Sequence, residues 1–146
     1  MSRIRPATSG DLSRIAEILV FNYRLYFYPI FLSDEFYFGD LTVENMAAEL
    51  ADSLAQLWVY DDSVVKGFTQ IGPGEVKRLF VEPALQGRSI GAELLRFAVE
   101  EKNARFLWAL EKNTRAIRFY QRHGFHLTDD RKLEEDTTEY LIRLER

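Results

Sequence analysis

The sequence predicts an α/β domain of the α+β type, in which helices flank a mixed, mostly antiparallel central sheet with one parallel β-loop-α-β unit. Apolar residues recur at helical spacing in some segments and form short β-type runs in others. A strand, a glycine-bearing loop, a helix and another strand follow one another in the second half, and such a crossover places two strands in parallel. The 146 residues contain no internal repeat or linker, so we expect a single domain over residues 1–146.

The first half of the chain predicts short elements of both kinds. A capping pattern at residues 8–11 precedes the first helix. Pro29 and Gly39 divide the aromatic stretch 21–38 into short pieces that are too irregular for one long helix. The other elements expected here are a strand over residues 2–6, a helix after Thr42, and a hairpin of strands 57–60 and 64–71.

The second half contains the predicted parallel unit. Its first strand, residues 75–81, ends before Pro83, because proline cannot continue a ladder of backbone hydrogen bonds. The loop 86–92 leads into a helix, and we expect the charged segment 129–136 to be a solvated loop. The other expected elements are a strand over residues 106–110, a helix capped by Asn113 or Thr114 that stops at Gly124, and strands 125–127 and 139–144.

Composition excludes several kinds of site. The chain has no cysteine, which rules out disulfides, thiolate metal sites and a cysteine acyl-enzyme. Its formal net charge of −4 argues against a broad phosphate-binding face, so we expect no nucleic acid partner. No leader opens the sequence and no apolar run approaches the roughly 20 residues that span a bilayer, so we expect a cytoplasmic protein without a membrane partner. His123 and His126 belong to no triad or ligand cluster, and we expect no metal.

The loop 86–92 has the local chemistry of an anion site. It joins a strand to a helix N-terminus, where unpaired N–H groups and the helix dipole point at whatever occupies the loop. Gly87 and Gly91 allow a ligand to approach the main chain, and Arg88 adds positive charge. A tight turn explains these glycines equally well, and the segment matches neither a P-loop nor the glycine pattern of a dinucleotide-binding fold.

Two motifs follow each other in the second half. The first is Val81-Glu82-Pro83 followed by Gln86-x-x-Ser89-x-Gly91-Ala92, and the second is Asn113-x-x-Ala116-x-x-Phe119-Tyr120-x-x-x-Gly124-Phe125. In this order and at this distance they resemble the acetyl-CoA loop and the next motif of the GNAT superfamily of N-acetyltransferases. The first half of the chain is similar to that superfamily only in the order of its strand, two helices and hairpin.

The resemblance implies where acetyl-CoA binds. In this superfamily the two parallel strands splay apart, and pantetheine lies in the gap, bonded to main-chain groups at positions that match Leu79 and Val81. Main-chain amides matching residues 87–92 hold the pyrophosphate. Ser89 stands where the superfamily usually has glycine, and it keeps the N–H donor but restricts the backbone. The implied cofactor residues are Leu79, Phe80, Val81, Gln86, Gly87, Arg88, Ser89, Ile90, Gly91, Ala92, Asn113 and Tyr120.

Tyr120 and Glu75 are the expected catalytic residues. Tyr120 matches the tyrosine that protonates the departing thiolate, and a phenol with a pKa of about 10 is protonated at neutral pH; its alternative role is packing beside Phe119. An alkyl amine has a pKa of roughly 10.4, so exposing its lone pair at pH 7 costs on the order of 4 to 5 kcal/mol and requires a base. Glu75 matches a catalytic glutamate of some members, acting directly or through water, although a solvent-exposed strand end describes it nearly as well. Glu111, Glu35 or a water chain are the alternatives.

The acceptor is expected to be a primary amine on a small molecule or a peptide, and the sequence does not identify it. Small amines, amino-acid derivatives, protein lysines and protein N-termini all fit. The segment between the first two helices borders the acceptor pocket in GNAT proteins, and it is crowded with aromatic residues near Asp34 and Glu35. We expect most of them in the core and a few in an apolar pocket or in cation–π contact with the amine. They are Tyr23, Tyr26, Tyr28, Phe31, Phe36, Tyr37 and Phe38.

The predicted reaction is direct attack of the amine on the thioester in a ternary complex, because no candidate for a covalent acyl-enzyme stands out. Two other functions remain open at this point. One is a non-catalytic acetyl-CoA-binding or interaction module of the same fold, and the other is an α/β interaction domain without a cofactor. We expect a monomer or a homodimer.

Overall fold

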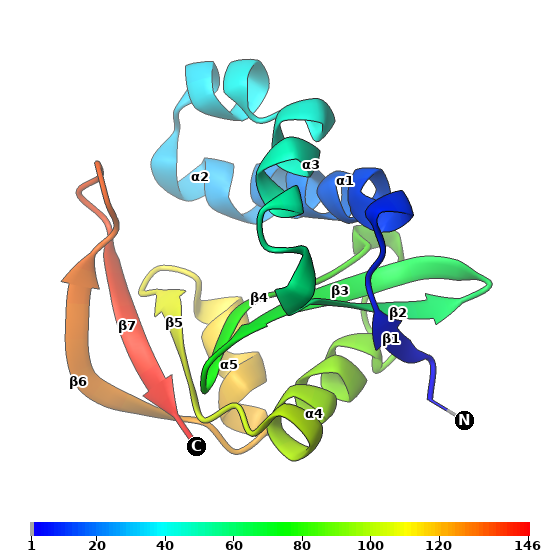
Figure 1. Cartoon of the computed structure of the whole chain (residues 1–146). Coiled ribbons are helices and arrows are strands. Elements are labelled where there is room, and N and C mark those ends of the chain that lie inside the picture. The colour runs from blue at the N-terminus through cyan, green and yellow to red at the C-terminus, as the bar shows by residue number, and fades with distance from the viewer. Residues whose placement is uncertain (1) are drawn as a thin grey trace.

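The computed structural model describes residues 2–146, in which helices lie on both sides of one sheet (Figure 1). The strands are ordered β1-β2-β3-β4-β5-β7-β6, and each neighbouring pair is antiparallel except β4 and β5. This confirms the predicted mixed sheet with one parallel pair. The strands are β1 (Ile4–Pro6), β2 (Leu57–Asp62), β3 (Val64–Gly72), β4 (Glu75–Val81), β5 (Phe106–Leu110), β6 (His126–Leu133) and β7 (Tyr140–Glu145), and the helices are α1 (Leu12–Asn22), α2 (Tyr28–Phe31), α3 (Val43–Ala51), α4 (Ile90–Lys102) and α5 (Thr114–Arg122).

The start of α1 is held by the predicted capping pattern. The Thr8 backbone N–H donates to the Asp11 carboxylate at 2.8 Å. Arg5 on β1 donates to the same carboxylate at 2.8 and 3.0 Å. These hydrogen bonds, with the Arg5 pairing as the largest cause, lower the pKa of Asp11 to about 2. The first strand and the first helix are thereby joined at the edge of the molecule.

The aromatic segment after α1 stays helical for longer than the sequence predicts. A π-helical turn, Tyr23–Phe27, connects α1 directly to α2. Pro29 does not end the helix, because it lies in the first turn of α2, where a backbone N–H would have no partner within the helix. The chain leaves the helix at Leu32, whose φ is +57°. The segment does fall into short pieces, as expected, but the predicted break at Pro29 was wrong, because the chain leaves the helix at Leu32.

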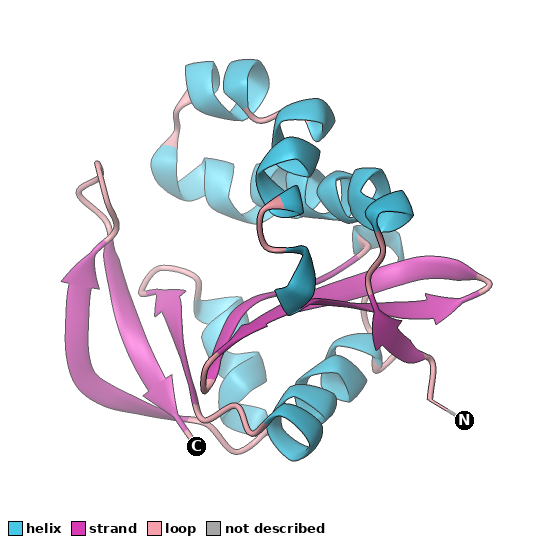
Figure 2. Cartoon of the chain, viewed as in Figure 1, coloured by secondary structure: helices cyan, strands magenta, loops and turns pink. Residues whose placement is uncertain are grey.

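Two layers of helices enclose the central strands (Figure 2). On one face, α1 and α3 pack against the sheet around Phe68, which has no exposed surface. On the other face, α4 and α5 pack around buried residues that include Leu95, Ala98 and Leu107. The apolar periodicity of α1 and α4 in the sequence therefore corresponds to the faces that these helices bury.

One extra residue in β4 changes the direction of its side chains. Gln70 of β3 pairs with Arg78, but Ile71 pairs with Val76, so Lys77 forms a β-bulge. Val76 and Val81 are five residues apart, yet both are buried on the α4 side of the sheet. Beyond the bulge β4 also separates from β5, since the two strands are paired only at the first residue of each.

The last hairpin differs from its prediction. Residues 129–133 were expected in a solvated loop, but they belong to β6, which pairs with β7 across an irregularity between Leu127 and Arg131. The charged side chains of this segment remain exposed, as is common on an edge strand, where they hinder pairing with another chain. The charged residues of this segment correctly predicted that it is exposed, but they did not predict its backbone conformation.

Candidate functional site

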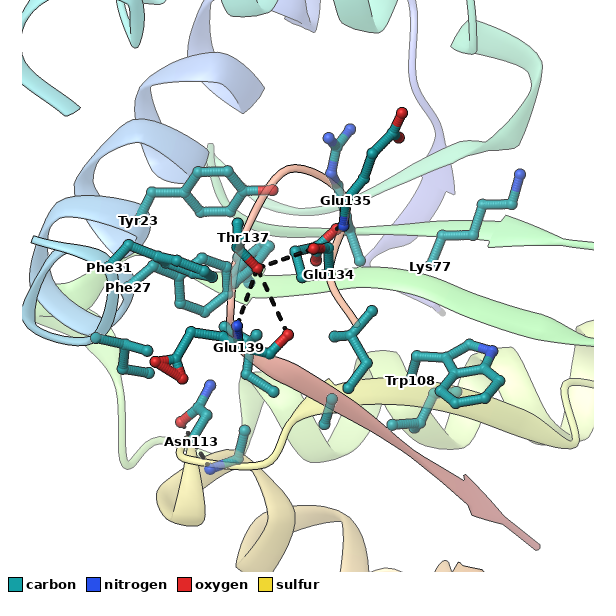
Figure 3. Close-up of a pocket in the computed structure, with 18 of the residues that line it drawn as sticks. Tyr23, Phe27, Phe31, Lys77, Trp108, Asn113, Glu134, Glu135, Thr137 and Glu139 are labelled. Carbon is teal, nitrogen blue, oxygen red and sulfur yellow. Dashed lines mark hydrogen bonds between the residues drawn. The ribbon is translucent and has the colours of Figure 1, made fainter. Parts of the chain in front are cut away.

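A cavity of about 950 Å³ lies where β4 and β5 separate (Figure 3). Three parts of the chain that are distant in sequence surround it: the helical segment between α1 and α3, the two diverging strands, and the turn between β6 and β7. The first turns of α5 add Ala116 and Tyr120. The cavity therefore brings together aromatic, main-chain and acidic groups.

The open edge of β4 presents main-chain groups to this gap. The Glu82 N–H donates to the Lys66 carbonyl of the β3 side at 2.9 Å. Because alternate residues of an antiparallel strand bond to the same neighbour, Phe80 also bonds to β3, while Leu79 and Val81 direct their N–H and C=O groups toward β5. Since β5 has already diverged there, the edge is open to an extended ligand.

The loop before α4 has the conformation of an anion site. Gly87 and Ser89 have φ values of +83° and +66°, and residues 87–89 are all exposed, Arg88 included. The N–H groups of residues 90–92 lie in the first turn of a 13-residue helix, where they have no partner within the helix. Ser89 adopts the left-handed conformation that a glycine would accept without strain, at a cost of roughly 1 to 2 kcal/mol.

Gln86 is held by protein groups rather than exposed to a ligand. Its side-chain oxygen accepts from the Tyr26 hydroxyl at 2.8 Å and from the Arg115 guanidinium. Its amide nitrogen donates to the Asn22 oxygen at 3.3 Å, and Asn22, which is 2% exposed, donates to the Val81 carbonyl at 2.9 Å. Gln86 therefore fixes the loop to α1 and α5, and the carbonyl of Val81 is already bonded.

Tyr120 and Asn113 both line the cavity from α5 and its N-cap. The Asn113 side chain caps the helix by accepting the Ala116 N–H at 3.3 Å. The Tyr120 ring packs edge-on against Phe119 at 5.2 Å and Phe125 at 5.9 Å. Its hydroxyl makes no hydrogen bond to another group within residues 2–146, and burial raises its pKa above the usual value of 10. The phenol is therefore protonated at neutral pH.

The structure places the carboxylates proposed as bases in different surroundings. Glu75 is the first residue of β4, next to the lining residue Val76, but it is not itself in the cavity lining. Glu111 accepts from Arg131 at 2.7 Å on the surface. Glu35 is exposed and also lies outside the lining. None of these three carboxylates faces the cavity directly.

More of the aromatic side chains line the cavity than the sequence predicted, and of the seven only Tyr37 is fully buried in the core. Four of the seven predicted residues line the cavity, namely Tyr23, Phe31, Phe36 and Tyr37, and Phe27 joins them. In contrast, Tyr28 donates to Asp34 on the surface, and Phe38 is 57% exposed.

Two kinds of feature are absent from residues 2–146. These residues contain no group of three or more His, Cys, Asp or Glu side chains placed to hold a metal ion. They also contain no helix that combines the length and the apolar character needed to cross a membrane.

Comparison with known proteins decides the family. The sequence model of the acetyltransferase (GNAT) domain matches residues 53–127, which is just over half of the chain. The chain belongs to the GNAT acetyltransferase family. The matched residues include β4, the loop before α4, β5 and α5, so they cover the strand side of the gap but neither the helical segment between α1 and α3 nor the turn between β6 and β7.

Individual GNAT proteins are similar to this chain in sequence or in fold. It is 36% identical over 77 residues to the peptidyl-lysine N-acetyltransferase YiaC of Escherichia coli (strain K12), and the match spans 51% of this chain and 53% of YiaC, about half of its length. An N-acetyltransferase from Staphylococcus aureus Mu50 superposes with a TM-score of 0.77 at 16% identity, covering 97% and 98% of the two chains. YncA from Salmonella typhimurium, solved with acetyl-CoA, gives 0.67 at 19% identity and covers 97% and 90%. At these identities the structural matches show the fold.

The residues at the GNAT gap fit acetyl-CoA. Gly87 has open space above it, since a Cβ placed there would meet nothing within 4 Å. The open edge at Leu79 lines the cavity, whereas the exposed loop and the first-turn N–H groups of α4 follow β4 in the chain and lie outside the cavity lining. Together they offer main-chain donors and acceptors to the two ends of such a ligand.

Sequence reasoning missed two parts of the GNAT site. Asn22 continues the buried spacing of Ile15, Ile18 and Leu19 on α1, and a polar residue at a core position is a signal that it bonds to something specific. The turn 134–139 also lines the cavity, although its charged residues are typical of an ordinary solvated segment. Nothing local in that turn indicates which surface it faces.

Proposed function

We propose that this protein transfers the acetyl group of acetyl-CoA to a primary amine, by direct attack within a ternary complex. The observation that carries the proposal is the cavity itself, in which the open edge of β4 and Tyr120 face the same space. Family membership supports the same reaction class. Acetyl-CoA supplies the activated thioester, and the protein supplies positioning and proton transfer.

Each part of the site has a defined task in this proposal. The N–H groups of residues 90–92 and the Arg88 side chain hold the pyrophosphate, and the main chain of Leu79 holds the pantetheine arm. Tyr120 donates its proton to the departing thiolate. Glu75 receives the acceptor's proton through water, because the amine needs about 4 to 5 kcal/mol to become neutral at pH 7.

Protein lysine is the first acceptor to test. YiaC is named as a peptidyl-lysine N-acetyltransferase, and it is 36% identical to this chain over 77 residues. A lysine side chain has a narrow aliphatic stem that suits the aromatic side chains of the cavity, and a cationic end that suits its carboxylates. Small alkyl amines and amino-acid derivatives complete the panel.

The decisive experiment measures acetyl-CoA binding and thiol release separately. Calorimetry should give binding of acetyl-CoA, and a thiol assay over the amine panel should give amine-dependent release of CoA. Binding without release for any amine would leave a non-catalytic module of the same fold. Absence of binding would leave an interaction domain without a cofactor.

A further inference from the structure

The helical wall of the cavity consists of aromatic rings that have no cation of their own. The rings of Tyr23 and Phe27 stack at 4.7 Å, and both meet Phe80 edge-on, at 5.6 and 6.1 Å. Seven other rings each have a lysine or arginine between 4.0 and 5.9 Å from the ring centroid. Over residues 2–146 no such cation lies on these three rings, so they are free to attract a positively charged ligand.

A carboxylate enters the same cavity from the opposite side. Glu139 precedes β7, and Figure 3 shows its side chain reaching into the cavity toward the side where Phe27 and Phe31 lie. The side chain is 14% exposed, and one of its oxygens accepts from Lys112 at 2.8 Å. The mostly exposed Lys112 leaves the second oxygen of this carboxylate for a ligand.

The backbone around Glu139 holds this carboxylate in position. Its N–H donates to the Thr137 hydroxyl at 3.1 Å, and its carbonyl accepts the Glu134 N–H at 2.8 Å. These bonds close the turn between β6 and β7. The main chain of Glu139 is therefore fixed by the turn, and the hydrogen bond from Lys112 restrains its side chain before any ligand binds, which reduces the ordering cost of binding.

The residues that line the cavity carry a net negative charge. Four carboxylates line the cavity, those of residues 134–136 and Glu139, against two cations, Lys77 and Arg78. Arg78 is engaged with the Gln70 side chain at 3.2 Å. A cavity with an excess of negative charge raises the local concentration of cations.

We propose that Glu139 and the aromatic wall of Tyr23, Phe27 and Phe80 bind an alkylammonium group. The site selects amines that enter as cations on an aliphatic stem over aromatic amines, which are neutral at pH 7. The claim that this cation is the acceptor of the acetyl group rests on the proposed function. The binding of a cation does not depend on acetyl transfer.

The test compares two probes of nearly equal shape without acetyl-CoA. Choline carries a trimethylammonium group, and 3,3-dimethylbutan-1-ol carries a neutral tert-butyl group in its place. We expect choline to bind the native protein about tenfold more tightly, by calorimetry or NMR titration. Glu139→Gln should reduce the ratio to within about twofold. Lys112→Met, which removes the competing ammonium, should increase the ratio.

The control is Glu111→Gln, which removes a surface carboxylate outside the cavity and should leave the ratio unchanged. Equal affinity of the native protein for the two probes overturns the proposal. Retention of the choline preference in Glu139→Gln overturns it as well. If the preference depends on Glu139 but no amine releases CoA, acetyl transfer is rejected while the cation site stands.

Discussion

Replacement of Tyr120 by phenylalanine separates catalysis from packing. The change removes one hydroxyl and leaves the ring, so the edge-on contacts with Phe119 at 5.2 Å and Phe125 at 5.9 Å persist. If the phenol is the general acid, kcat should fall about 10²- to 10⁴-fold, which is the usual range for such a group. Affinity for acetyl-CoA should change little.

The structure also predicts the effect on stability. The Tyr120 hydroxyl has no hydrogen-bond partner within residues 2–146, so no internal bond is lost. Tyr120 is only partly buried and lines the cavity, so the free energy of unfolding should change by no more than about 1 kcal/mol. For a chain of this size that corresponds to a change in Tm of about 3 °C or less.

The assay combines three measurements on each variant. Thiol release with a saturating amine gives kcat, calorimetry gives the Kd of acetyl-CoA, and thermal unfolding gives Tm. Tyr60→Phe is the matched control, because Tyr60 is a buried tyrosine that lies outside the cavity. Equal kcat for Tyr120→Phe and the native protein, under conditions where chemistry limits the rate, would reduce Tyr120 to a packing residue.

Three further predictions concern cofactor binding, the base and stability. Gly91→Val should weaken acetyl-CoA binding tenfold or more by calorimetry, or about 1.4 kcal/mol, because branched methyls would crowd the N–H donors of α4. Glu75→Gln should depress kcat/KM most near pH 7 and progressively less at higher pH, since the amine's own deprotonation cost falls by about 1.36 kcal/mol per pH unit. Asp11→Asn should lower the free energy of unfolding by about 2 kcal/mol at pH 7 in urea titrations, because Arg5 depresses the folded-state pKa of Asp11 from 3.8 to about 2. That stability is present above the unfolded-state pKa of 3.8, so the difference should shrink as pH falls below 4, be mostly lost by pH 2 and vanish below it.

Each of these variants has its own control. At Gly91 a Cβ would lie 3.4 Å from the Phe119 ring, which is an ordinary contact, so the control Gly91→Ala should fold normally. Full cofactor affinity in a folded Gly91→Val variant would argue against the loop as the phosphate site. Parallel pH profiles of the Glu75→Gln and native enzymes would remove this residue from the mechanism. An Asp11→Asn deficit that is unchanged at pH 2 would mean that packing, and not the ion pair with Arg5, is responsible.

Much of the cofactor side of the site could be predicted because it is local. β4 and β5 have the bounds expected for residues 75–81 and 106–110, since Pro83 and the apolar runs act over a few neighbouring residues. The N-cap of α5 is Asn113, one of the two residues proposed. The loop before α4 has its predicted place at a helix N-terminus.

The acceptor side required the tertiary structure. Glu139 and Phe27 are separated by more than a hundred residues, and they line one cavity because the last hairpin and the helical segment flank the same gap. No periodicity in either segment refers to the other. The bulge at Lys77 was equally invisible, since it appears only in the register between β3 and β4. The sequence by itself determined the parallel unit and the loop before α4 through short-range sterics and capping, while the contents of the cavity depended on long-range packing that brings distant segments together.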